Sequence, residues 1–270
     1  MRQKIKIVDT NFAHAKYSTD YQESKYIDWD RSPVTPDDKL IFYTDQYSQY
    51  AIKNRINIAW LMEPEEINSQ TYKWIVTHND IFKFVITHDK KLIDRKENYF
   101  FVPACGCWIS PQDQKIYNKN KLVSIIASGK NWTIGHNLRH ESISKFRDKM
   151  DVYGRGYNPI YYKLTALKDY MFSLTIENAK KDYWFTEKLN DCFLTGTVPI
   201  YWGCPSIDNF FNIDGMIIFD KIEDLPRILE DLSIDKYLSM KNAIEENFEK
   251  AKEYLIAEDY IYKNYINNNV

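Results

Sequence analysis

The residues with the clearest chemical potential lie between positions 173 and 206. An apolar run there ends in Glu177 and Asn178, a polar loop follows, and Glu187 and Lys188 open an amphipathic helical segment. A carboxylate at this place can accept both hydroxyl groups of a ribose, and a neighbouring ammonium can neutralise a phosphate. The spacing therefore indicates a site for a nucleotide or a phosphorylated sugar.

A basic stretch precedes this segment. Residues 115–150 contain eight Lys and Arg against two acids, in a chain of net charge −2. Such a run can simply be the solvated face of a helix. Here, however, Arg139 follows a turn that contains Gly129 and Gly135, and the free N–H groups of a helix start together with a guanidinium suit a diphosphate. We expect Arg139 to contact one.

Acidic residues also end a predicted strand in the first half of the chain. The strand at 57–61 leads into Glu63, Pro64, Glu65 and Glu66. Carboxylates at the end of a parallel strand can face a ligand. The same residues suit an ordinary helix start, because proline fits the first turn and acids favour the helix N-terminus. The residues alone leave both interpretations open.

The periodicity of the chain predicts the elements that position these groups. Short β-rich runs alternate with helical ones twice over, which is typical of parallel sheets covered by helices. Helices are expected at 67–76, 90–95, 136–149, 185–195, 222–231 and from 234 to about 265. The expected strands are Lys4–Val8, Leu40–Tyr43, Ile56–Leu61, Phe82–Thr87, Phe100–Val102, Leu122–Ala127, Val152–Tyr153, Met171–Ile176, Val198–Tyr201 and Met216–Phe219.

This pattern predicts an α/β protein with two Rossmann-like domains that face each other across a cleft. The first domain is expected at 1–110, the second at 111–250, and a helical segment at 251–270 that packs back. Ligands of such sheets bind beyond the carboxyl ends of the strands. The acidic strand end of the first domain and the Glu187 region of the second are therefore expected at the cleft.

Composition narrows the class of protein. The chain has 270 residues, 44% of them hydrophobic, which is enough for one large or two small cores. The near-neutral charge disfavours nucleic acid as a partner, although the basic stretch keeps a DNA acceptor open. The first residues lack the apolar core of a secretory signal, and no apolar stretch approaches the length needed to cross a bilayer. A cytoplasmic location is expected.

The segment at 173–206 resembles the family 10 α-1,3/1,4-fucosyltransferases. Their motif runs F-x-L-x-x-E-N, then five residues, then Y-x-T-E-K, and further on P-x-x-x-G. The run Asp151-Val152-Tyr153-Gly154 is similar to a V-D-x-Y-G strand of that family, and Arg139 stands at the place of its phosphate-binding arginine. The resemblance covers about residues 121–220. The residues in register with the motif are Phe172, Leu174, Glu177, Asn178, Thr186, Glu187, Lys188, Pro199 and Gly203.

The resemblance implies roles for individual residues. Glu63 matches the glutamate that deprotonates the acceptor hydroxyl in the family, with Glu65 as the alternative base. Trp184 stands where the family has Tyr, and Ala179 where it has Ser or Thr; an indole keeps a stacking surface but lacks the phenolic hydroxyl. The implied contacts of the nucleotide sugar are Arg139, Tyr153, Gly154, Glu177, Asn178, Tyr183, Trp184, Thr186, Glu187 and Lys188.

No metal site is expected. Asp28-Trp29-Asp30 has the D-x-D pattern that binds manganese in single-domain glycosyltransferases, but that class needs a strong apolar strand before the triplet, and Tyr26-Ile27 is a weak one. His78 and His88 each follow a threonine on an apolar element. They are more readily structural or solvated than substrate contacts.

The expected activity is a metal-independent, inverting glycosyl transfer in a single displacement. The resemblance implies GDP-fucose as donor, a glycan or another hydroxyl-bearing molecule as acceptor, and no cofactor. Two alternatives stay open. The same fold can use another nucleotide sugar or an unusual acceptor such as modified DNA, or the chain can be a non-catalytic protein that binds a sugar nucleotide or a glycan.

Overall fold

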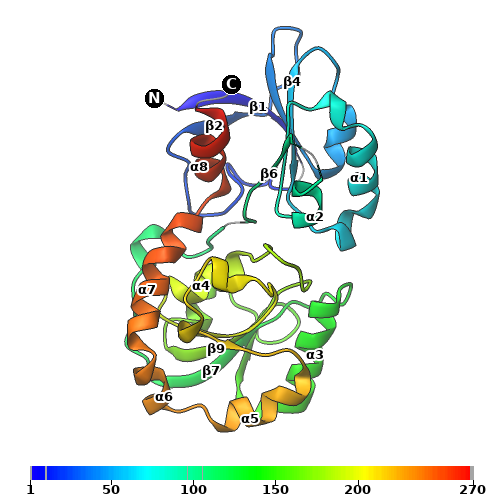
Figure 1. Cartoon of the computed structure of the whole chain (residues 1–270). Helices are drawn as coiled ribbons and strands as arrows, with labels where there is room; N and C mark the ends of the chain where they lie inside the picture. The colour runs from blue at the N-terminus through cyan, green and yellow to red at the C-terminus, as the bar shows by residue number, and fades with distance from the viewer. Residues whose placement is uncertain (1, 10, 96, 105, 268–270) are drawn as a thin grey trace. The chain divides into compact units, whose positions relative to one another are not determined.

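The computed structural model describes residues 2–9, 11–95, 97–104 and 106–267. The chain forms two compact units, one of residues 1–106 with 256–270 and one of residues 107–255. Each unit is built on one parallel sheet with helices packed against it (Figure 1). The predicted α/β class with two Rossmann-like domains is confirmed. Within the described ranges, no helix is long and apolar enough to cross a membrane.

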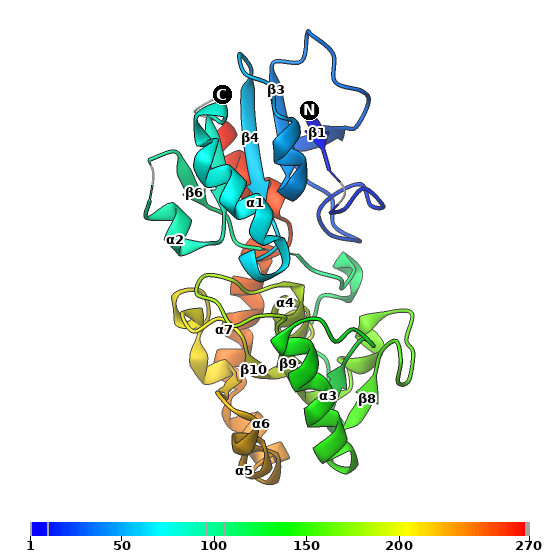
Figure 2. The same ribbon diagram turned by 90° about the vertical axis from the view of Figure 1, so that its right-hand side faces the viewer.

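Among its described residues, the first unit holds six parallel strands in the order β2-β1-β3-β4-β5-β6. Residues of α1 (Glu65–Thr77) share a buried cluster with β3, β4 and β5, and Figure 2 shows α1 alongside β4. The short α2 is Lys90–Ile93. The strands are β1 (Gln3–Val8), β2 (Ile27–Asp30), β3 (Leu40–Thr44), β4 (Ile56–Leu61), β5 (Phe84–Thr87) and β6 (Tyr99–Phe101).

Strand β2 was not predicted from the sequence. It is a short edge strand in which Trp29 is buried, and it includes the Asp28-Trp29-Asp30 triplet. The indole nitrogen of Trp29 donates a hydrogen bond of 2.9 Å to Glu258, a residue near the other end of the chain. A contact between such distant residues leaves no local pattern, so periodicity could not indicate this strand.

The last helix packs against the first unit, as expected. In Figure 1 the helix α8 (Ala257–Ile261) lies beside β2. Its Glu258 is fully buried and accepts hydrogen bonds from Ser18 as well as from Trp29. Asp259 accepts one from the hydroxyl of Ser24 at 2.7 Å. These bonds fix the C-terminal segment to the first strands.

The second unit holds five parallel strands in the order β11-β10-β9-β7-β8. All seven residues of the central strand β9 are buried. Successive side chains of β10 enter two different clusters, because Ile200 and Trp202 pack in one and Tyr201 in the other. The strands are β7 (Lys121–Ile126), β8 (Asp151–Tyr153), β9 (Tyr170–Ile176), β10 (Val198–Trp202) and β11 (Ile217–Ile218).

Helices cover this second sheet. Leu189 and Phe193 of α4 are buried in the cluster that contains Tyr201, together with Phe185 just before the helix. This confirms the apolar face that recurs every four residues in the sequence. The helices are α3 (Ile134–Phe146), α4 (Glu187–Phe193), α5 (Leu225–Glu230), α6 (Ile234–Ser239) and α7 (Lys241–Ala251).

Candidate functional site

Glu177 ties the end of β9 to the start of α4. Its fully buried carboxylate accepts hydrogen bonds from the backbone N–H of Thr186 at 2.8 Å and from the hydroxyl of Thr186 at 2.7 Å, and Lys188 lies 3.3 Å away. Thr186 is the N-cap of α4. A Cβ added at Gly203 would come within 2.6 Å of the Glu177 side chain, so this position needs glycine. The motif spacing from Glu177 to Lys188 thus builds a rigid turn.

Glu187 lies at the first position of α4 and keeps 22% of its side chain exposed. The ammonium groups of Lys163 and Lys188 are 3.2 and 3.5 Å from the same carboxylate oxygen. Burial alone would raise the pKa of Glu187, but the two ammonium groups outweigh it and hold the pKa well below its usual range. The carboxylate stays ionised, and an ionised carboxylate is the better acceptor for hydroxyl groups.

Lys163 was not predicted from the sequence. Its ammonium also lies 2.9 Å from Asp191, a residue 1% exposed, and Asp191 accepts a hydrogen bond of 2.7 Å from the backbone N–H of Trp108. Burial would lower the pKa of Lys163, but Asp191 and Glu187 together raise it. Asp191 could have been found, because it follows Glu187 by one helical turn. Lys163 opens a separate short 3-10 helix, Lys163–Ala166, and has no such signal.

Arg139 holds the end of β9 from α3. Its guanidinium is buried and donates hydrogen bonds to the carbonyl of Ile176 at 3.0 Å and to the side chain of Asn178 at 2.6 Å. The helix start touches the same strand end, since a Cβ added at Gly135 would lie 1.7 Å from the carbonyl oxygen of Glu177. The structure therefore brings Arg139, Glu177 and Asn178 together, and it gives Arg139 a structural role at this place.

The aromatic candidates separate into buried and half-buried groups. Trp184 is 2% exposed, so its indole supports the fold of the loop and presents little stacking surface. Tyr183 is half-buried, and its ring meets Phe210 edge-on at 5.6 Å. The Tyr153 hydroxyl pairs with that of Tyr170 at 2.7 Å.

Gly154 marks the end of β8. It adopts a φ of +114°, and an added Cβ would lie 2.0 Å from the carbonyl oxygen of Ala127. Only glycine tolerates both conditions. Gly154 therefore allows the chain that leaves β8 to approach the end of β7 closely.

Several lysines of the basic stretch contact other parts of the fold. Lys119 donates to the carbonyls of Leu167, Lys168 and Thr195. Other members form ion pairs: Lys121 with Asp151 and Lys145 with Glu141. These three lysines are thus engaged with other parts of the fold.

In the first unit, Glu63 follows β4 beside a second carboxylate that was not predicted. Asp45, at the end of β3, is fully buried and accepts hydrogen bonds from the N–H of Met62 at 3.0 Å and from the Asn11 side chain. Burial raises the pKa of Asp45 to about 7. The Asn11 hydrogen bond opposes this shift, and the charge of Glu63 adds to it. The rule that indicated Glu63, a polar group at a strand end, also applies to Asp45.

Glu65 and Glu66 lie in the first turn of α1, and Pro64 is its N-cap. The interpretation of these acids as an ordinary helix start therefore agrees with the structure. Glu63 lies outside the helix, and its backbone carbonyl accepts a hydrogen bond of 3.0 Å from the Tyr72 hydroxyl. This hydrogen bond and those from the N–H groups of Met62 and Glu63 to Asp45 hold the backbone around Glu63 in place.

The two histidines occupy different surroundings. His78 stacks on Trp74 with ring centroids 4.4 Å apart, as a structural residue does. His88 is buried and lines a small cavity of about 50 Å³ with Trp60, Met62 and Pro103, beyond the ends of β4, β5 and β6.

The D-x-D triplet is neutralised within the protein. Asp30 pairs with Lys6 at 3.1 Å and with Lys4 at 3.4 Å. A hydrogen bond from Ser32 and the neighbouring lysines lower the pKa of Asp30. Across the ranges that the structure describes, no group of three or more His, Cys, Asp or Glu side chains could hold a metal ion.

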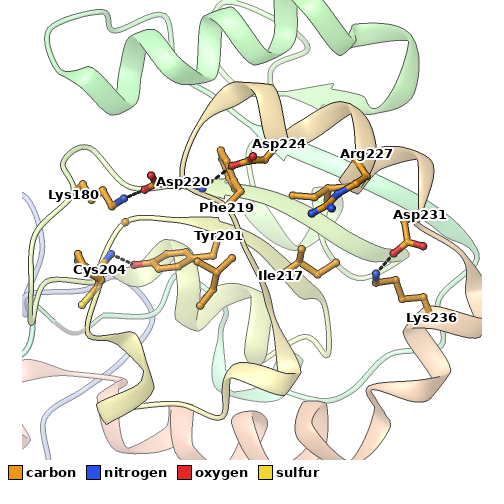
Figure 3. Close-up of a pocket in the computed structure, with 14 residues that line it drawn as sticks. Lys180, Tyr201, Cys204, Ile217, Phe219, Asp220, Asp224, Arg227, Asp231 and Lys236 are labelled. Carbon is orange, nitrogen blue, oxygen red and sulfur yellow. Dashed lines mark hydrogen bonds and ion pairs between the residues drawn. The ribbon is translucent and has the colours of Figure 1, made fainter.

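An open pocket of about 730 Å³ lies beside β10 and β11 (Figure 3). Apolar side chains such as Ile217 contribute to its lining, and charged groups surround it. Lys180 pairs with Asp220 and Lys236 with Asp231, so charge is balanced locally. The described residues that line this pocket include neither Glu187 nor Lys188.

Comparisons with known proteins find similarity in the part of the chain that contains Glu187. Residues 116–241 match the model of glycosyltransferase family 10 (fucosyltransferase) C-term. An α-(1,3)-fucosyltransferase of Helicobacter pylori is 33% identical over 111 residues, which are 40% of this chain and 22% of that protein. A fucosyltransferase-like protein of Arabidopsis thaliana is 32% identical over 107 residues, 38% and 20% of the two chains. The match thus spans about a fifth of the length of these relatives.

Solved structures extend the likeness to both units. A crystal structure of α1,3-fucosyltransferase with GDP has a TM-score of 0.57 at 17% identity and covers 100% of this chain and 92% of its own. Another of α1,3-fucosyltransferase has a TM-score of 0.59 at 18% identity, with 100% and 91% covered. At such identities the likeness concerns the fold, which is of the GT-B type. The resemblance seen in the motif is confirmed, since residues 116–241 match the C-terminal model of glycosyltransferase family 10.

Proposed function

We propose that this protein is an inverting glycosyltransferase that moves L-fucose from GDP-fucose to a hydroxyl group of an acceptor. The observation that carries the proposal is Glu187, held ionised by Lys163 and Lys188 at the start of α4. The family match covers this site, and one similar crystal structure is of α1,3-fucosyltransferase with GDP-fucose. These findings support a nucleotide sugar as the donor.

In the proposed site, Glu187 accepts hydrogen bonds from the two ribose hydroxyls. Lys188 faces the diphosphate. Arg139 supports the site through its hydrogen bonds to Asn178 and to the end of β9. Tyr153, Gly154, Tyr183, Trp184 and Thr186 shape the surrounding loops. Negative charge that develops on the leaving phosphate is met by the ammonium groups, which makes a metal ion unnecessary in this mechanism.

The reaction is a single displacement. The carboxylate of Glu63 takes the proton of the acceptor hydroxyl as its oxygen attacks the anomeric carbon. The bond from that carbon to the phosphate oxygen breaks, and the nucleoside diphosphate leaves with the electron pair. One displacement inverts the anomeric centre, so GDP-β-L-fucose gives an α-linked product. Glu65 is the alternative base, and the acceptor is a glycan or another hydroxyl-bearing molecule, modified DNA included.

Calorimetry followed by a transfer assay tests the proposal. The protein is titrated with GDP, UDP and CDP, and then incubated with GDP-fucose and a panel of glycans, with and without EDTA. We expect selective binding of GDP, transfer that survives EDTA, and an α-linked product by NMR. Loss of transfer with EDTA and its recovery with Mn²⁺ would contradict the metal-free mechanism. Binding of GDP without transfer to any acceptor would favour a non-catalytic binding protein.

A further inference from the structure

Trp108 is an exposed indole on a fixed backbone. Its neighbours Cys107 and Ile109 are fully buried, whereas Trp108 itself is 40% exposed. The backbone N–H of Trp108 donates a 2.7 Å hydrogen bond to the buried carboxylate of Asp191. The main chain at this point is thus held, and the aromatic side chain is left accessible.

Lys163 connects this ring with the carboxylate at the start of α4. Its ammonium lies 4.7 Å from the centroid of the Trp108 ring and 3.2 Å from Glu187. These distances place the indole centre within about 8 Å of the Glu187 carboxylate, even when the three groups lie in line. In a nucleoside, the ribose hydroxyls and the base are joined through a few covalent bonds, so one nucleoside can reach both groups.

The chemistry of the indole suits such a ligand. Every nucleobase has a π face, and stacking on an aromatic side chain does not depend on the pattern of donors and acceptors on the base. The cation–π contact with Lys163 and the hydrogen bond to Asp191 hold Trp108 in place, which reduces the entropy lost when a base stacks. The buried Trp184, by contrast, offers little surface to a base.

We propose that Trp108 is the surface on which the base of the bound nucleoside diphosphate stacks. This inference rests on the proposed function, in which Glu187 holds the ribose. It adds a contact for the base from the segment that precedes the family match at residue 116.

Titrations of GDP and of inorganic pyrophosphate into wild type, Trp108→Ala and Trp108→Phe test the inference. Trp108→Ala should bind GDP about tenfold to a hundredfold more weakly, because a base stack is lost, while pyrophosphate binding should stay unchanged. Trp108→Phe should retain most of the affinity for GDP. Trp132→Ala is the matched control, since Trp132 is 77% exposed in the same unit. Its affinity for GDP should equal that of wild type.

Fluorescence gives a second readout that does not depend on the stability of the alanine variant. The chain has seven tryptophans, and GDP should quench part of the emission of wild type but not of folded Trp108→Phe. Unchanged GDP affinity in folded Trp108→Ala, or a loss in Trp132→Ala instead, would overturn the inference and leave the proposed function intact. A wild type that binds none of GDP, UDP and CDP would instead overturn the proposed function.

Discussion

The pKa values of two carboxylates, Glu187 in the second unit and Asp45 in the first, shift in opposite directions. In the second unit Glu187 and Asp191 both lie beside the ammonium of Lys163, and Lys188 adds a second positive charge to Glu187. In the first unit Asp45 is bonded to neutral N–H groups, and the charge of Glu63 has the same sign as its own. The two ammonium groups therefore keep Glu187 ionised, whereas burial moves the pKa of Asp45 to about 7.

This difference matches the chemistry that we assign to each unit. A carboxylate that binds ribose must stay charged at all working pH values, and nearby cations ensure this. A carboxylate that acts as a base gains proton affinity from a negative charge nearby. Glu63 lies near Asp45, and its charge raises the pKa of that carboxyl group.

The largest expected effect is on turnover, and it tests the role of the first unit. Glu63→Gln keeps the shape of the side chain and removes its proton affinity, so kcat should fall by about 10²–10⁴-fold. The affinity for GDP should stay unchanged, because the proposed nucleotide contacts belong to the other unit. Glu65→Gln is the control. A large loss in Glu65→Gln with an intact Glu63→Gln would move the base by two residues.

The next effect tests the cationic network of the second unit. Lys163→Met leaves the carboxylate of Asp191 without its ammonium, and we expect a loss of about 2–4 kcal/mol in the free energy of unfolding. Adding Asp191→Asn should restore part of this loss, since the uncompensated charge is removed. Urea unfolding of the single and double variants measures the loss and its recovery. Lys168→Met is the control, because Lys168 is exposed. Equal stability of Lys163→Met and wild type would contradict the importance of the network.

The smallest effect concerns pH and Asp45. The folded chain holds this proton up to a pKa of about 7, whereas the reference value is 3.8. The folded state therefore binds more protons between these values, and its stability falls as pH rises through them. The side chain of Asp45→Asn cannot lose a proton. From pH 5 to pH 8, the free energy of unfolding of this variant should therefore rise by about 2–3 kcal/mol relative to that of wild type. Urea unfolding at both pH values checks this, with the exposed Asp37→Asn as control.

Much of the fold was predictable, because the local pattern of apolar residues indicates most of the strands and helices. The buried strands β3, β4 and β9 are mostly apolar runs, and such runs indicate parallel strands without any knowledge of their partners. Strand β2 could not be predicted in this way, since Trp29 is fixed by Glu258 more than two hundred residues away. Local periodicity carries no information on such a contact.

The motif from Glu177 to Lys188 determined by itself the loop, the helix start and the family to which residues 116–241 are similar. Only the tertiary structure decided how each group is used. It turned Glu177 and Arg139 into supports of β9, buried Trp184, and brought Lys163 and Trp108 to Glu187. The physical reason is that burial and ionisation depend on neighbours in space, and these neighbours come from distant segments whose sequences have no common period.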